Sequence, residues 1–110
     1  MESNKPRFYL RVHVLPLGGL MASIVDEESL GVVERDHEKG LVIDVSEHFY
    51  KGDLVDEEGA LKAMDEAEVM ILVGRRAVSL GIRAGYVHQD AVLKVGSLEY
   101  AQVFKFREHY

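Results

Sequence analysis

Two adjacent arginines stand where this sequence changes from a predicted strand to a predicted helix, a junction at which proteins often bind anions. The apolar run Val69–Val73 predicts a buried strand, and Gly74 follows it. Arg75 and Arg76 then open a helix that we expect to end near Ala84. A helix start exposes free N–H groups and a partial positive charge, which attract phosphate or carboxylate. Arginines oppose that charge by about 0.3–1 kcal/mol each, and such a local conflict can mark a site that awaits an anion.

Helical spacing adds a third arginine to this junction. Arg76, Ser79 and Arg83 fall on one helical face, as do Arg75 and Arg83. The predicted anion-binding residues are Gly74, Arg75, Arg76 and Arg83. A plainer interpretation pairs the arginines with carboxylates at the end of the preceding helix, namely Asp65, Glu66 and Glu68. The single glycine excludes a Walker loop and a dinucleotide fingerprint.

Cationic and aromatic side chains recur in the first and last predicted strands. In residues 7–14 the period-two pattern places on one side Arg7, Tyr9, Arg11 and His13. In residues 98–106 it places on one face Tyr100, Gln102, Phe104 and Phe106, and on the other Lys105 and Arg107. If both strands lie in one sheet, a single face could combine phosphate-binding cations with base-stacking rings, as in single-stranded RNA binders. The candidate contacts are Arg7, Arg11, Tyr100, Gln102 and Lys105, although aromatic residues in a terminal strand also commonly pack in the core.

The remaining side chains predict neither catalysis nor a metal site. The chain has no cysteine and no serine in a nucleophile elbow, and its histidines lack the spacing of metal ligands. The 19 carboxylates make close pairs inevitable, and most such residues belong to solvated helix faces. We therefore assign no catalytic residue, no metal ligand and no cofactor.

Charge is segregated along the 110-residue chain, whose formal net charge is −6. Residues 1–25 carry net +2, residues 26–68 net −11 and residues 69–110 net +3. This balance excludes a uniformly basic nucleic-acid-binding chain. We expect folding to bring the two cationic ends together and to turn the acidic middle elsewhere.

The elements that must position these residues are mostly strands. The predicted elements are, in chain order, a hairpin over 7–14 and 20–25, a helical turn at 26–31, a strand at 41–45, a short turn capped by Ser46, a helix capped by Asp56, the strand and helix around Gly74, and a hairpin over 91–95 and 98–106 with a type II′ turn at Gly96-Ser97. This order predicts an α+β fold with a mixed, mainly antiparallel sheet, hairpins at both ends and two main helices packed on one side. Residues 1–6 are expected to form a disordered tail and residues 7–110 a single domain.

The chain resembles an archaeal family of small proteins, domain-of-unknown-function family 424, from about Tyr9 to Val103. The segments that carry the resemblance are Asp26–Gly31, Leu41–Ser46, Phe49–Asp53, Leu72–Gly74, Arg76–Val78, Ala84-Gly85 and Ala101–Val103. The resemblance implies an archaeal cytosolic protein and supplies no activity. This chain departs from the family at Ile71, where an asparagine is usual, at Arg75, where an acidic residue is usual, and at Glu99-Tyr100, where Pro-His is expected.

Composition and the resemblance together predict a cytoplasmic protein. The longest apolar run has five residues, far short of the roughly 20 that span a bilayer, and the first residues lead into a strand without an apolar signal region. Few amides, no cysteine and many charges are typical of a thermophile. We expect no membrane partner.

Three functions remain open at this point. The first is a non-enzymatic binding module whose partner is RNA or a ribonucleoprotein. The second is a protein-interaction subunit or homodimer that uses the acidic middle or edge strands. The third is a small enzyme that holds an anionic substrate at Gly74 and uses a nearby carboxylate or His88 as base.

Overall fold

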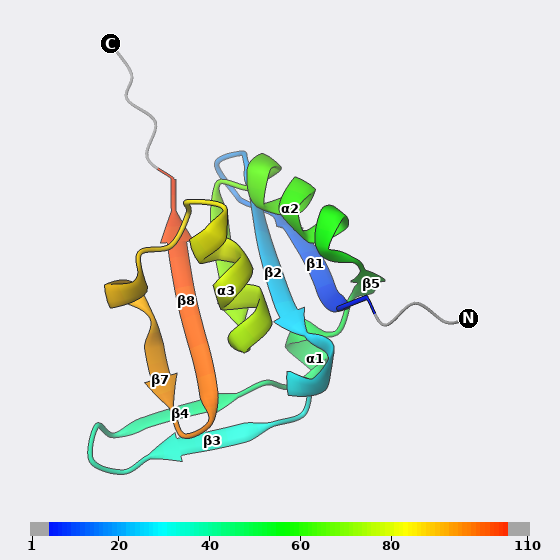
Figure 1. Ribbon diagram of the computed structural model, residues 1–110. Helices are drawn as coiled ribbons and strands as arrows, with labels where there is room; N and C mark the ends of the chain where they lie inside the picture. Colours follow the sequence, from blue (N-terminus) through cyan, green and yellow to red (C-terminus); the bar gives the residue numbers. More distant parts are fainter. Residues whose placement is uncertain (1–4, 106–110) are drawn as a thin grey trace.

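A six-stranded sheet forms the centre of the computed structural model, which describes residues 5–105 (Figure 1). The strands of this sheet are β1 (Phe8–Val14), β2 (Leu20–Asp26), β5 (Asp53–Val55), β6 (Val69–Val73), β7 (Leu93–Val95) and β8 (Leu98–Phe104). Their order is β5-β1-β2-β6-β8-β7, and every neighbouring pair is antiparallel except β2 and β6. The predicted α+β fold, with its mixed, mainly antiparallel sheet and terminal hairpins, is confirmed.

Two helices cover one face of this sheet, as predicted (Figure 1). They are α2 (Glu57–Glu66) and α3 (Arg75–Arg83). The Asp56 carboxylate accepts the Gly59 N–H at 2.9 Å, so the predicted cap of α2 is confirmed. The core between helices and sheet is built from Ile24, Met64, Met70, Leu72 and Leu80, all buried.

The opposite face of the sheet is covered at one end by a second, two-stranded sheet. Strands β3 (Val33–Asp36) and β4 (Leu41–Asp44) form a hairpin that crosses the ends of β7 and β8 (Figure 1). The short helix α1 (Glu47–Tyr50) follows, and the Ser46 hydroxyl caps it by accepting the Phe49 N–H, as predicted. A smaller core of Val25, Val45 and Val73 lies beneath this cover.

The structure adds two strands that the sequence did not predict. Strand β3 has a mostly charged sequence, and β5 has only three residues, so neither carries a clear alternating pattern. The C-terminal hairpin begins at Leu93 rather than residue 91, because Gln89–Ala91 form the 3₁₀ turn η2. Another 3₁₀ turn, η1 (Glu27–Ser29), forms the helical turn that was expected after β2.

The remaining expectations concern the turn at residues 96–97 and the chain ends. Gly96 has φ +57° and Ser97 a negative φ, which agrees with the predicted type II′ turn. Most of the expected tail, residues 1–6, lies outside the described residues, and so do Phe106 and Arg107.

Candidate functional site

The start of α3 faces a carboxylate of the chain itself. Asp26, the last residue of β2, is 2% exposed, and its Oδ2 and Oδ1 accept the backbone N–H groups of Arg76 (2.8 Å) and Ala77 (2.7 Å). Gly74 permits this approach: its φ is +104°, and a Cβ there would lie 2.4 Å from the Asp26 carboxyl carbon. The two N–H groups at the centre of the predicted anion site therefore already have an acceptor inside the protein.

Burial dominates the electrostatics of this internal cap. Desolvation of the carboxylate raises the pKa of Asp26, although the two N–H bonds and the nearby Arg76 charge act in the opposite direction. The Asp26 cap therefore stabilises the start of α3, but burial destabilises the ionised carboxylate relative to the protonated carboxyl group.

Arg76 is held by a network at the same helix end. Its Nε donates to Glu28 Oε2 at 2.9 Å, its Nη2 donates to Glu28 Oε1 and to the Arg7 carbonyl oxygen (3.0 Å), and its guanidinium lies 4.9 Å from the centre of the Phe8 ring. The hydrogen bonds from Arg76 lower the pKa of Glu28, and the same bonds raise the pKa of Arg76. The third guanidinium nitrogen, Nη1 of Arg76, is buried without a hydrogen-bond partner in the described part of the chain.

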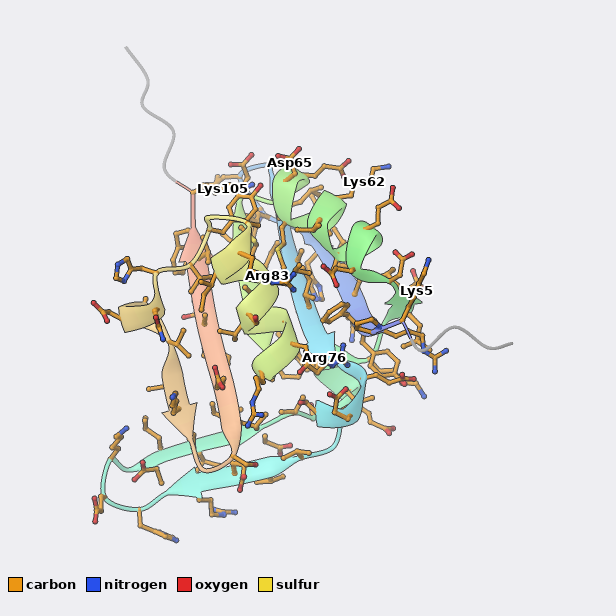
Figure 2. The ribbon with its side chains drawn as sticks, in the orientation of Figure 1. Lys5, Lys62, Asp65, Arg76, Arg83 and Lys105 are labelled. Atoms are coloured by element: carbon orange, nitrogen blue, oxygen red, sulfur yellow. The ribbon has the colours of Figure 1, made fainter. Side chains whose placement is uncertain are left out.

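The predicted arginine face borders a hollow of about 190 Å³, which we call the α3 groove. Its lining residues are Pro6, Phe8, Glu57, Arg75, Arg76, Ser79 and Arg83. Arg76 lies at the N-terminal end of α3 and Arg83 near its C-terminal end (Figure 2). The structure therefore brings together the three arginines and the serine that helical spacing placed on adjacent faces.

The partners of these arginines differ from the carboxylates at 65–68 that we considered. Arg83 Nη1 lies 3.4 Å from Glu57 Oε1, and Arg75 Nε lies 3.7 Å from Glu99 Oε2. The carboxylates at 65–68 lie at the other end of β6, because this five-residue strand places about 16 Å of extended chain between them and the start of α3. Arg75 is loosely held, because its side chain is 84% exposed.

The first and last strands lie in one sheet, but β2 and β6 separate them by about 14 Å. The strand register aligns one row of His13, Met21, Val69 and Phe104, and a second row of Arg11, Ser23, Ile71 and Gln102. A third row contains Tyr9, Val25, Val73 and Tyr100. The predicted polar and aromatic side chains of β1 and β8 thus share the face opposite α2 and α3. Helix α1 lies against the β1 part of this face, since its Phe49 ring stacks on His13 with centroids 6.0 Å apart.

The predicted cations of the two ends are engaged elsewhere. Arg7 precedes β1 and pairs with Glu27 at 2.8 Å. Arg11 Nη1 donates to the carbonyl oxygens of His48 (2.6 Å) and Phe49 (3.0 Å). Lys105 lies on the helix side, where its Nζ donates to the carbonyl oxygens of Met64 (2.6 Å) and Asp65 (2.9 Å) at the end of α2 (Figure 2).

The acidic middle of the chain provides partners for the cationic segments. The pairs Arg7–Glu27, Arg76–Glu28 and Arg83–Glu57 each join a terminal segment to residues 26–68. The expectation that the acidic middle faces elsewhere is therefore wrong. Sequence reasoning also missed Asp26 and Glu28 as partners of α3. One signal was available for Asp26, because an acidic residue directly ends the apolar strand 20–25.

Residues 5–105 contain no group of three or more His, Cys, Asp or Glu side chains placed to hold a metal ion. Within the same range, no helix has the length and apolar character needed to cross a bilayer.

The fold defines the chain as a small α+β protein built on a mixed six-stranded sheet. Residues 17–106 match the family described as "Protein of unknown function (DUF424)", and the chain belongs to this family, as the resemblance predicted. The crystal structure of an uncharacterized conserved protein from the archaeon Methanopyrus kandleri is similar, with 25% sequence identity and a TM-score of 0.71 over 94% of this chain and 97% of that one. The comparison with curated proteins finds no match.

Proposed function

We propose that this protein is a non-enzymatic binding module of the cytoplasm that holds a compact anionic group, a phosphate or a carboxylate, in the α3 groove. The observation that carries the proposal is a single hollow of about 190 Å³ whose lining includes Arg75, Arg76, Arg83 and Ser79. That volume equals about six water molecules, enough for a phosphate with a few attached atoms.

The three arginines would have different roles in binding. Arg76 is fixed by Glu28 and the Arg7 carbonyl oxygen, so it supplies a positioned charge at the edge of the groove. Arg75 and Arg83 have long contacts to Glu99 and Glu57, at 3.7 and 3.4 Å. Exposed ion pairs of this kind contribute about 0–1 kcal/mol, so an incoming phosphate can replace them at little cost.

A compact anion suits this groove better than a continuous polyanion. The carboxylates of Glu28, Glu57 and Glu99 stand around the groove and would repel a phosphodiester chain that crosses it. The exposed ring Phe104 lies on the other face of the sheet and is not available to stack bases held here. The RNA or ribonucleoprotein partner predicted from the sequence is retained in a narrower form, in which the groove holds a terminal phosphate.

Titration with phenyl phosphate at low ionic strength tests the proposal. We expect saturable binding that weakens with salt, and a loss of about tenfold or more in affinity for the double variant Arg75→Ala/Arg83→Ala. Arg35→Ala, which removes an exposed arginine of β3, serves as the matched control and should bind as the parent does. Equal affinity in parent and double variant would overturn the proposal. Parallel titrations with single-stranded RNA carrying a 5′-phosphate or a 5′-hydroxyl decide whether RNA supplies the phosphate.

A second candidate function, self-association, is favoured by the tip of the β1–β2 hairpin. Leu17 at this tip is fully exposed, and Val14 is 79% exposed on the part of β1 beyond Leu10, where the pairing with β5 ends. Beside it lies an apolar hollow of about 150 Å³ between β1, β2 and α2, with Lys62 and Glu66 on its rim. A cavity of that volume accommodates a group as large as benzene, so Leu17 of a second copy fits in size. A twofold arrangement would make the contact twice.

Light scattering at increasing concentration tests this candidate. A dimer that Leu17→Asp disrupts, and that Val33→Asp on β3 leaves intact, would support it. A strict monomer, or a dimer unaffected by Leu17→Asp, would contradict it.

A further inference from the structure

The β3–β4 hairpin encloses a cavity against the sheet face opposite α2 and α3. This cavity has a volume of about 380 Å³, twice that of the α3 groove, and falls in the range of small-molecule sites. Its lining residues are Leu41, Val42, Ile43, Asp44, Tyr50, Leu93 and Tyr100. Figure 1 shows β4 crossing below the ends of β7 and β8, which is where these residues meet.

Three polar groups of the cavity lack partners within the protein. The exposed Asp44 carboxylate forms no ion pair or hydrogen bond with residues 5–105, and the hydroxyls of Tyr50 and Tyr100 likewise have no hydrogen-bond partner there. The other walls are aliphatic, from Leu41, Ile43 and Leu93 among others. An apolar cavity with a few convergent polar groups is the usual form of a binding site for a small molecule.

The two tyrosines are neutral at physiological pH, and the ring of Tyr50 packs against one neighbouring ring. Burial raises the pKa of Tyr50, and the Asp44 charge raises it further. Burial also raises the pKa of Tyr100, with a smaller effect from Tyr50. The Tyr50 ring packs edge-on against Phe49 with centroids 4.7 Å apart. The residues that line the cavity therefore include one carboxylate and two neutral tyrosines.

We propose that this cavity binds a small organic cation, namely a protonated alkylamine whose ammonium group contacts Asp44 and the two tyrosines. An ammonium group has three N–H donors and no acceptor, which matches three acceptor side chains. Ring faces of tyrosine attract cations, and the aliphatic walls suit the carbon chain of the amine. An anion would face Asp44, and a neutral alcohol would leave that carboxylate without a counter-charge.

The surrounding chain favours a cation as well. Asp44 belongs to the hairpin segment 33–44, which carries four acidic and two basic residues, net −2, whereas the three arginines of the α3 groove lie on the other face of the sheet. The negative potential of the hairpin raises the local concentration of cations. This proposal is therefore independent of the anion site, and either one can fail while the other holds.

Calorimetric titration with n-pentylammonium, in parallel with n-pentanol, tests the proposal. The ammonium should bind in the millimolar range or tighter and more tightly than the alcohol, and salt should weaken only the ammonium. Asp44→Asn should lower the affinity for n-pentylammonium by about tenfold or more, and Tyr100→Phe by a smaller factor. Glu38→Gln removes the same charge from the turn of the same hairpin, outside the cavity, and should leave the affinity within about twofold.

Three results would each overturn the proposal. They are no binding of n-pentylammonium at about 20 mM, equal affinity for ammonium and alcohol, and equal losses in Asp44→Asn and Glu38→Gln. Thermal melting of each variant shows whether it is folded. If Asp44→Asn does not fold, Tyr100→Phe and the comparison of ammonium with alcohol decide the question on their own.

Discussion

Gly74→Ala should destabilise the protein far more than the same change at another glycine with positive φ. The new Cβ would lie 2.4 Å from Cγ and Oδ2 of Asp26, so the carboxylate must move away from the helix start. Alanine at φ +104° and ψ +155°, a region almost restricted to glycine, costs about 1–3 kcal/mol by itself. Loss of the charge-assisted bonds from the Arg76 and Ala77 N–H groups adds about 2–3 kcal/mol. We expect the free energy of unfolding to fall by about 4 kcal/mol, a large part of the 5–15 kcal/mol typical of a domain.

The matched control is Gly18→Ala in the β1–β2 turn. Gly18 has φ +95°, and a Cβ there would meet nothing within 4 Å, so only the backbone cost of about 1–2 kcal/mol applies. Urea unfolding followed by circular dichroism measures both variants. A third variant, Asp26→Gly, removes the whole clashing side chain, including the Cβ that would lie 2.7 Å from the new Cβ, so adding Gly74→Ala to it should cost only about as much as the backbone strain of Gly74→Ala. Equal losses for Gly74→Ala and Gly18→Ala in the parent would refute the reasoning.

Three further predictions concern the N-terminal end of α3 and the C-terminal end of α2. Because the pKa of Asp26 is raised in the folded state, this carboxyl group ionises first in the unfolded chain, and the free energy of unfolding should fall as pH rises from about 3.8 through the higher folded-state pKa. Urea unfolding measured across this pH range should show that the fall disappears in Asp26→Asn. An unchanged fall in that variant would assign the effect to another group. The pKa of Glu28 is lowered, so its effect on stability has the opposite pH dependence: the contribution is present above the ordinary glutamate pKa and is lost as pH falls through the lowered value. Glu28→Gln should lower the free energy of unfolding by at most about 1 kcal/mol at neutral pH, because the Glu28 side chain is 63% exposed. Lys105→Met should lower stability by about 1 kcal/mol, because the Nζ bonds to the last carbonyls of α2 are lost while the alkyl stem is kept, and a thermal melt indistinguishable from the parent would contradict this.

Elements with a strong local pattern could be predicted from the sequence. The alternation in residues 8–14, the apolar run 69–73 and the caps Ser46 and Asp56 each depend on neighbours within a few residues. Strand β5 could not be predicted in this way, because its three residues become a strand only by pairing with Phe8–Leu10. Tertiary pairing, not local propensity, decides such short edge strands.

The candidate site could be predicted only in part, for a similar reason. Helical spacing placed Arg76, Ser79 and Arg83 together, and the structure confirms that they line one groove. Which carboxylates face them could not be read from the sequence, because Asp26 lies 50 positions before Arg76 and Glu28 lies 48 before it. Those contacts depend on the parallel pairing of β2 with β6, which no local pattern encodes.

That parallel pair also has a consequence for how the chain folds. Met21 pairs with Val69, so the centre of the sheet forms only after the whole intervening segment, with its hairpin, α1, β5 and α2, has been looped out. The hairpins β1–β2 and β7–β8 close over short turns, in about 1–10 μs, whereas closing the long loop is entropically costly and slow. The rate-limiting step of folding is therefore expected to be the pairing of the two preformed hairpins with β6, which lies between β2 and β8. Extra residues inserted at the β3–β4 turn should slow this step only slightly, since doubling the length of a loop costs about 0.6 kcal/mol.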